Sequence, residues 1–235
     1  MSRLNKYLAD CGVGSRRECD KLIADGVVKI NGKTATLGAT VEEKDVVTVN
    51  GKRAVIKSKK CYVMLHKPKG CVTTVKDDFG RKTVMDFVTD LKERLFPVGR
   101  LDYDTEGLLI LTNDGDVANR LTHPKNNVEK VYVARISGSL AETERKQLER
   151  GVEIDGEKTL PAKVKILEKD EHHTRCEVTI SEGRNRQIKK MFEAVGKEVE
   201  FLKRIAVGEI RLGGLQRGKW RFLNEKEMEY LESLK

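Results

Sequence analysis

The segment from Gly99 to Gly115, GRLDYDTEGLLILTNDG, combines charged residues that could do chemistry with an apolar run. Arg100 and Asp102 stand in a short polar turn, and Leu108 to Leu111 follow as a buried strand that ends at Asn113-Asp114-Gly115. A carboxylate held at the mouth of a sheet suits covalent or acid/base chemistry. Asp102 is therefore the candidate catalytic residue, and a plain structural turn is the alternative.

The same turn imitates the start of a calcium-binding loop. Asp102, Asp104, Glu106 and Gly107 have the spacing 1-3-5-6 of such a loop. Position twelve would be Asn113 instead of a bidentate glutamate, and the intervening LLILT is typical of a strand. The five cysteines stand singly and the four histidines show no metal-ligand spacing. We therefore expect no metal site, and we expect reduced, mostly buried thiols.

Composition indicates a globular protein with a strongly solvated surface. Of the 235 residues 35% are charged, and no stretch approaches the roughly 20 apolar residues of a membrane span. The N-terminus has no signal-peptide core, so we expect a cytoplasmic protein that does not contact membranes. The net charge is +9, and the first 60 residues hold 13 Lys and Arg against 7 Asp and Glu. This asymmetry indicates a polyanion-binding module, with an ordinary solvated face as the alternative.

The first 60 residues predict two short helices followed by a hairpin. The helices are expected over residues 3–9 and 16–24, with Ser15 as the N-cap of the second and Glu18 completing a capping box. Strands are expected over 27–30 and 46–49, each followed by an Asn-Gly turn. Residues 52–60 are basic and poor in structural signals, so we interpret them as a linker.

The remainder of the chain predicts an α+β domain with a mixed, mainly antiparallel sheet flanked by helices. Residues 76–82, KDDFGRK, form a long exposed loop that could fold over a substrate. Helices are expected over 114–121, 142–150 and 185–194. Strands are expected over 61–65, 108–111, 130–136, 162–167, 175–180, 201–210 and 220–223.

The sequence GVGSRRECDKLIADGVVKINGK resembles the S4 RNA-binding domain, a helix pair and hairpin that hold structured RNA. Arginines near a helix N-terminus add their charge to the helix dipole, and phosphates bind there readily. The resemblance implies an S4-like domain over residues 1–58. The candidate RNA-binding residues are Arg3, Lys6, Ser15, Arg16, Arg17, Lys21, Lys29 and Lys33.

The opening segment, extended to PVGRLDYDTEGLLILTNDG, resembles the signature of the RsuA/RluB/RluE/RluF family of ribosomal RNA pseudouridine synthases. HKPKG, FGRKTV, KVYVARISG and ISEGRNRQIKKMFEAVG follow the family pattern in order. His66 stands where Asn is common, and Lys189-Lys190 where Arg pairs are common. The resemblance implies a catalytic domain over residues 59–235.

The resemblance implies roles for several residues. Asp102 would attack the sugar or abstract a proton, so that uracil leaves C1′, rotates and rejoins through C5 without a cofactor. A cation should favour the ionised carboxylate, and Arg184 and Arg186 are the candidates. Tyr132 would pack against the flipped base. Four further residues would line the cleft or contact RNA: Arg100, Lys130, Gln187 and Lys189.

Two other functions remain open from the residues alone. A non-catalytic RNA-binding factor would explain the basic N-terminus but not the second domain's motifs. A metal-dependent nuclease needs clustered carboxylates, yet a strand separates Asp102 and Asp104 from Asp114 and Asp116 by roughly 13–17 Å if extended. The expected partner is a structured stem-loop of ribosomal RNA, with 23S RNA favoured over 16S RNA, and the expected state is a monomer.

Overall fold

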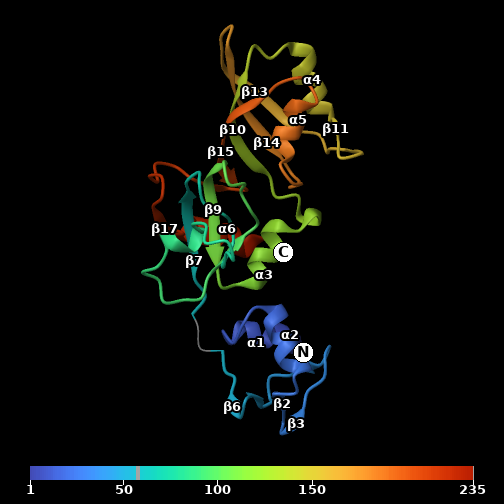
Figure 1. Ribbon diagram of the computed structural model, residues 1–235, viewed down its shortest axis with the longest axis vertical. Coiled ribbons are helices and arrows are strands. Elements are labelled where there is room, and N and C mark those ends of the chain that lie inside the picture. Colours follow the sequence, from blue (N-terminus) through green and yellow to red (C-terminus); the bar gives the residue numbers. More distant parts are fainter. Residues whose placement is uncertain (57–58, 235) are drawn as a thin grey trace. The chain divides into compact units, whose positions relative to one another are not determined.

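The computed structural model describes residues 1–56 and 59–234. The chain divides into two compact units, one of Met1–Cys61 with Asn113–Gly115 and one of Tyr62–Thr112 with Asp116–Lys235 (Figure 1). The expected domain boundary at residue 58 lies outside the described residues, as does part of the expected linker. Each unit is described by itself below.

The N-terminal unit is built on the two expected helices. These are α1 (Leu4–Asp10) and α2 (Arg16–Ala24). The capping box at α2 is confirmed: the Ser15 hydroxyl accepts from the Glu18 backbone N–H, and the Glu18 carboxylate accepts from the Ser15 N–H. The apolar faces of both helices pack on a core that includes Leu4, Leu8, Cys19, Ile23, Val28 and Val47.

A four-stranded sheet completes this unit. Its order is β3 (Lys33–Thr34), β2 (Val28–Ile30), β5 (Val47–Val49) and β6 (Lys52–Arg53), and β1 (Ser2–Arg3) pairs separately with β4 (Thr40–Val41). The expectation that the linker begins at Lys52 is wrong. The Asn50-Gly51 turn folds Lys52–Arg53 back onto β5, and Ala54 is buried in the core.

The second unit contains one sheet of nine strands. The sheet runs in the order β13 (Lys163–Lys169), β14 (His173–Ile180), β10 (Lys130–Ser137), β15 (Val199–Val207), β9 (Glu106–Thr112), β7 (Tyr62–Lys67) and β17 (Trp220–Phe222). β8 (Phe96–Val98) pairs with β9, and β16 (Ile210–Arg211) pairs with β15. Within this sheet only the β15–β9 pair is parallel, so the expected mixed, mainly antiparallel α+β fold is confirmed.

The helices of the second unit cover two parts of this sheet (Figure 1). α3 (Gly115–Thr122) and α6 (Glu225–Ser233) bury Val117, Leu121 and Leu231 against β7, β9 and the β15–β16 turn. α4 (Glu142–Arg150) packs against β13, and α5 (Gln187–Glu193) packs against β15. β9 is buried along its whole length, as its continuous apolar run predicts.

Some short elements carry no periodic signal in the sequence. They are the 3-10 turns Val84–Phe87 and Pro124–Asn126, the strands β8 and β16, and the hairpin β11 (Glu153–Ile154) and β12 (Glu157–Lys158). The strand expected over 201–210 is two strands, because the chain turns at Gly208. α6 was not expected, although Asn224 and Glu227 form a capping box at its start. None of the described helices is long and apolar enough to cross a membrane.

Candidate active site

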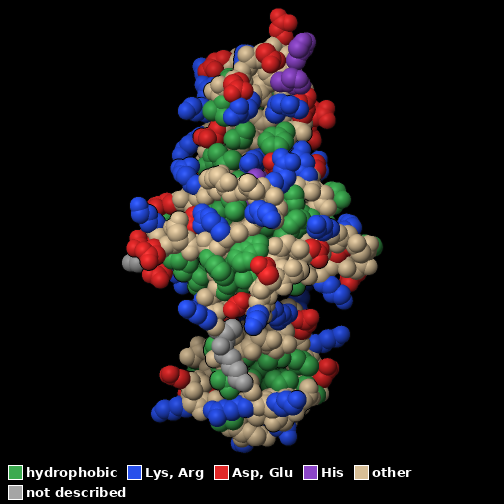
Figure 2. Space-filling view, turned by 90° about the vertical axis from the view of Figure 1, so that its left-hand side faces the viewer, with side chains coloured by type: hydrophobic (Ala, Val, Ile, Leu, Met, Phe, Trp, Pro, Cys, Tyr) green, Lys and Arg blue, Asp and Glu red, His purple; other side chains and the backbone are tan. Residues whose placement is uncertain are grey.

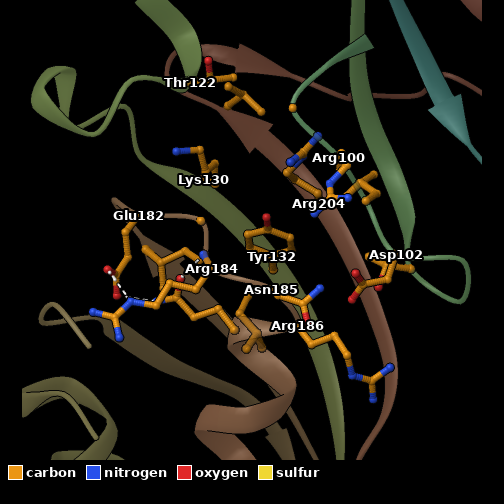
Figure 3. A pocket seen from close by; sticks show the side chains of 18 of the residues that line it. Arg100, Asp102, Thr122, Lys130, Tyr132, Glu182, Arg184, Asn185, Arg186 and Arg204 are labelled. Carbon is orange, nitrogen blue, oxygen red and sulfur yellow. Dashed lines mark hydrogen bonds and ion pairs between the residues drawn. The ribbon is translucent and has the colours of Figure 1, made fainter. Parts of the chain in front are cut away.

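A cavity of about 310 Å³ opens beside Asp102 in the second unit (Figure 3). Its wall comes from the turn between β8 and β9, from β10, from β15 and from the segment 180–188 that leads into α5. This volume lies at the small end of the range for ligand pockets and is suited to one base rather than to a duplex.

The side chain of Lys67, the last residue of β7, binds the backbone of the turn that carries Asp102. Lys67 is fully buried, and its Nζ donates to the backbone carbonyls of Asp102 (2.9 Å), Thr105 (2.9 Å) and Pro68 (3.1 Å). Burial lowers the pKa of this ammonium below its ordinary value. The charge is nevertheless fully hydrogen-bonded, because an ammonium has three N–H donors and each meets a carbonyl. Lys67 therefore anchors the turn.

Two further hydrogen bonds hold the same turn from the segment after β7. The Thr73 hydroxyl donates to the Leu101 carbonyl (2.7 Å) and accepts from the Leu101 N–H (3.3 Å). The Gly70 N–H donates to the Tyr103 carbonyl (2.8 Å). The backbone on both sides of Asp102 is thus fixed by groups from one neighbouring strand and loop, as a preorganised site requires.

Gly107 allows the strand that follows the turn to approach β15. Its φ is +117°, and a Cβ at this position would lie 2.1 Å from the Arg204 carbonyl oxygen. No other residue fits so close to a neighbouring backbone. Gly107 pairs with Arg204 in the parallel ladder, so it sets the distance between the Asp102 turn and the cavity wall.

The cation beside Asp102 is Lys189 of α5. Its Nζ lies 3.9 Å from Asp102 Oδ2 and 2.5 Å from Asp104 Oδ1, and its side chain is only 7% exposed. Burial raises the pKa of Asp104, but the hydrogen bond and charge of Lys189 outweigh it and lower that pKa below its ordinary value. Lys189, which we expect from the sequence to shape the pocket, lies between the two carboxylates of the turn and is not among the residues that line the cavity.

Arg184, one of the two candidates for pairing with Asp102, bonds other partners instead. Arg184 Nε donates to Glu182 (3.2 Å), and its terminal amino groups donate to the carbonyls of Glu157 and Lys158. Figure 3 shows Arg184 with Glu182 on the opposite side of Tyr132 from Asp102. Arg184 instead ties the start of α5 to the β11–β12 hairpin.

Arg186, the other candidate, lies at the rim of the cavity. It is the exposed N-cap residue of α5, with left-handed backbone at φ +51°. Its charge contributes to the lowered pKa of Asp104, but among the described residues no ion pair joins it to Asp102. The cationic partner of Asp102 is therefore Lys189, the buried third residue of the helix, instead of a residue at its exposed start.

Tyr132 and Lys130 lie on β10 and face the cavity, as their spacing of two residues predicts. Tyr132 is 9% exposed, and its ring lies between Arg184 and Asp102 in Figure 3. Burial lowers the pKa of Lys130, and the charge of Arg204 lowers it further.

Arg100 and Gln187 complete the predicted set. Arg100 is exposed and lines the cavity. A surface ion pair from it to Asp104 or Glu106 is not formed, since Lys189 bonds Asp104 and Arg217 bonds Glu106. Gln187 is buried, donates to Glu182 (2.7 Å) and accepts from the Arg184 N–H (3.0 Å). It shapes the wall by holding Glu182 in place.

Three residues at this site were not predicted from the sequence: Lys67, Glu182 and Arg204. Lys67 is the last residue of β7, and a charged residue at the end of an apolar strand is the one signal that could have found it. Glu182 and Arg204 act through partners far apart in sequence, which no local pattern shows.

The RNA-binding candidates lie on the surface of the N-terminal unit. Figure 2 shows Lys and Arg side chains at the surface of this unit. Lys6 is half-buried, whereas the others are exposed: Arg3, Ser15, Arg16, Arg17, Lys21, Lys29 and Lys33. The Ser15 hydroxyl caps α2, so its established role is structural.

Clustered acidic, His or Cys side chains able to hold a metal ion are not found among the described residues. Asp104 and Glu106, two residues of the spacing that resembles a calcium-binding loop, form ion pairs with two different cations, Lys189 and Arg217. Four of the five cysteines are buried.

Comparison with known proteins agrees with this geometry. A family model described as RNA pseudouridylate synthase matches residues 61–194, and one for the S4 domain matches residues 2–47. Ribosomal large subunit pseudouridine synthase B of Bacillus subtilis is 45% identical, covering 100% of this chain and 97% of the relative. Dual-specificity RNA pseudouridine synthase RluF of Escherichia coli K12 is 40% identical over 96% of this chain and 77% of its own.

A crystal structure titled as a pseudouridylate synthase has a TM-score of 0.70 and 33% identity, covering 98% of this chain and 100% of its own. The chain therefore belongs to the RNA pseudouridylate synthases, in the RsuA/RluB/RluE/RluF group with an N-terminal S4 domain. It is an enzyme that converts uridine in RNA to pseudouridine.

Proposed function

We propose that this enzyme isomerises a specific uridine in ribosomal RNA, with Asp102 as the catalytic carboxylate acting on a flipped-out nucleotide. One observation carries the proposal: Asp102 stands on a turn fixed by Lys67, beside Lys189, at the wall of a cavity whose opposite side is Tyr132. The side chain of Asp102 is 32% exposed, so a ligand in the cavity can reach it.

The reaction needs one carboxylate and no imported group. The C1′–N1 bond breaks, and its electron pair leaves with the uracil. Asp102 either attacks C1′, forming an ester bond that breaks when C5 of the rotated base bonds to C1′, or removes a sugar proton that returns to the sugar as that bond forms. C5 then loses its proton, and N1, which carried the electron pair, gains one. Lys67 and Lys189 hold the carboxylate where this chemistry occurs, since small displacements of a reacting group are costly.

The flipped base would stack on Tyr132, because aromatic faces commonly hold an extruded base. Arg100, exposed at the rim, would fill the vacated stack or bind the phosphate. Lys130 lines the same cavity, and Arg184, Gln187 and Arg186 frame the wall at the start of α5.

Residues 1–58 would bind a structured stem-loop through the exposed cations of α1, α2 and the hairpin, while residues 59–235 carry out catalysis. We favour 23S RNA over 16S RNA because the Bacillus subtilis relative is described as a large-subunit synthase. With ribosomal RNA as its proposed substrate, the enzyme would act in the cytoplasm. We also propose that it acts as a monomer.

Mapping pseudouridines in ribosomal RNA tests this proposal. Ribosomal RNA from cells lacking the protein should miss one or a few pseudouridines, and the purified wild-type enzyme should restore them in 23S RNA. Asp102→Asn should bind the same RNA with near-normal affinity and restore none, because the amide is neither nucleophile nor base. An active Asp102→Asn enzyme would contradict the role of Asp102, and restoration only in 16S RNA would contradict the substrate.

A further inference from the structure

Arg204 is a buried charge in the cavity that the reaction described above does not use. Arg204 is only 5% exposed, and its Nε donates to the Leu108 carbonyl at 2.8 Å. Among the described residues it has no other hydrogen-bond acceptor and no carboxylate partner. The terminal amino groups of a guanidinium bring four more N–H donors, and these are left for whatever occupies the cavity.

The position of Arg204 relative to the reacting groups is rigid. On β15 it pairs with Tyr132 of β10 on one side and with Gly107 of β9 on the other. Its bond to the Leu108 carbonyl joins its side chain to the strand that begins just after the Asp102 turn. Figure 3 shows Arg204 next to the Tyr132 ring, on the same side as Asp102.

A buried cation without an anionic partner is expensive, so such a group points to a negative charge that arrives with the ligand or develops during the reaction. Lys130 supports this interpretation. It lines the same cavity, and burial together with the charge of Arg204 lowers its pKa, so two cations converge on one space.

The chemistry of the reaction supplies the missing charge. When the C1′–N1 bond breaks, its electron pair goes to N1 and the uracil becomes an anion, with the charge shared by N1 and the two carbonyl oxygens. This holds whether Asp102 attacks C1′ or removes a sugar proton. We propose that Arg204 is a catalytic residue that stabilises the uracil anion by donating N–H hydrogen bonds to a carbonyl oxygen of the departing base. The inference rests on the proposed function.

The base, and not the phosphate, is the group that Arg204 faces. Its neighbour in the ladder is Tyr132, on which the base would stack, and both are buried. The exposed Arg100 at the rim is the cation suited to the phosphate backbone. Arginine is also suited to the task because it stays protonated when buried.

The test compares two substrates in single-turnover reactions: a ribosomal RNA fragment that the wild-type enzyme modifies, and the same fragment with 5-fluorouridine at the target. Fluorine withdraws electrons and makes the uracil a better leaving anion, so the reaction depends less on Arg204. Arg204→Gln should lower the rate of uridine consumption about 100- to 1,000-fold, as for removal of one oxyanion donor. On the fluorinated RNA the loss should shrink at least tenfold, while the Kd for RNA changes less than threefold.

Three controls separate this role from the alternatives. Arg204→Lys keeps the charge and should recover part of the activity, again more fully on the fluorinated substrate. Lys203→Gln changes the neighbouring residue on the opposite face of β15 and should leave both rates near wild type. Asp102→Asn should fail on both substrates alike.

Equal fold-losses for Arg204→Gln on the two substrates would overturn the proposal and leave a structural role. A loss confined to RNA affinity would overturn it in favour of a phosphate contact. If Arg204→Gln does not fold, the same comparison is made with Arg204→Lys, and a substrate-independent loss there overturns the proposal. A wild-type enzyme that modifies neither RNA would count against the proposed substrate and not against Arg204.

Discussion

The cations of the N-terminal unit and those around Asp102 are the same residue types in opposite surroundings. Arg16 and Arg17 are exposed at the start of α2, whereas Lys67 and Lys189 are almost completely buried. Exposed cations act on phosphates through water, and salt screens them within about 8–10 Å. Buried cations are screened far less, and they fix the geometry of the groups that they bond. Cationic side chains are thus available to a ligand at the surface of one unit, and in the other they fix the turn that carries Asp102.

Among substitutions that test this difference between exposed and buried cations, we expect the largest loss of activity and stability at Lys67. Lys67→Met should lower the free energy of unfolding by about 1–3 kcal/mol, because buried carbonyls lose their donor. It should also lower kcat about 100-fold, because the Asp102 turn is displaced. Lys69→Met, an exposed neighbour, is the matched control and should change both little. Chemical denaturation measures the change in stability, and single-turnover rates measure the change in kcat. A fully active Lys67→Met enzyme would show that the Asp102 turn keeps its conformation without Lys67.

Lys189 is expected to affect the reaction more than stability. Lys189→Met removes the positive charge 3.9 Å from Asp102 and should lower kcat about 10- to 100-fold, the effect of one to three kcal/mol on the barrier. Lys189→Arg should retain most of the activity. Lys190→Met is the control, because Lys190 pairs with Asp155 of the β11–β12 hairpin. Equal losses at the two positions would contradict a specific role for Lys189.

Charge reversal on α2 tests the exposed cations. Arg16→Glu with Arg17→Glu should weaken binding to ribosomal RNA about tenfold or more at physiological salt and reduce the salt slope of log Kd by about 2, one unit for each lost phosphate contact. The unfolding midpoint should stay constant, since the capping box at Ser15 is intact. Arg16→Lys with Arg17→Lys keeps the charge and should bind like wild type. Unchanged affinity in the reversed variant would contradict RNA binding by this helix.

The smallest effect is expected at Asp104, which is 57% exposed. Its pKa lies below its ordinary value of 3.8, so its ion pair with Lys189 stabilises the fold fully above that pH. The contribution is lost as the pH falls through the lowered pKa of the folded state. Thermal unfolding between pH 2 and pH 6 should therefore show a slightly steeper acid decline for wild type than for Asp104→Asn. Parallel curves would mean that this bridge adds nothing measurable.

Local signals predicted the N-terminal unit well. The Ser15–Glu18 capping box and the helix Arg16–Ala24 match the expectation, because caps and turns depend on neighbours in the chain. The same holds in the second unit for the helix Glu142–Arg150 and for β9. The linker expectation failed at Lys52 because a strand of two or three residues carries no periodicity, and the short strands β8, β11, β12 and β16 were missed for the same reason.

The sequence predicted several of the residues that line the cavity, but not the contacts that those residues make. Residues of the predicted set that line the cavity include Asp102, Arg100, Lys130, Tyr132 and Arg184. Arg184 and Arg186 were both candidates for the partner of Asp102, and neither forms an ion pair with it among the described residues, because the sequence does not say which carboxylate a charge at a helix start meets. Lys189 reaches Asp102 from 87 positions along the chain, a contact made by the packing of α5 against β15.

By itself the sequence determined the residue types, the caps, the buried strand after Asp102 and the order of motifs that identifies the family. Only the tertiary structure decided that Lys67 anchors the turn, that Lys189 lies beside Asp102, and that Arg204 lines the cavity with terminal amino groups that meet no acceptor among the described residues. The reason is physical. Periodicity and capping report interactions over a few residues, whereas these contacts join positions 35 to 96 residues apart and exist only after the strands pair in the order of this sheet.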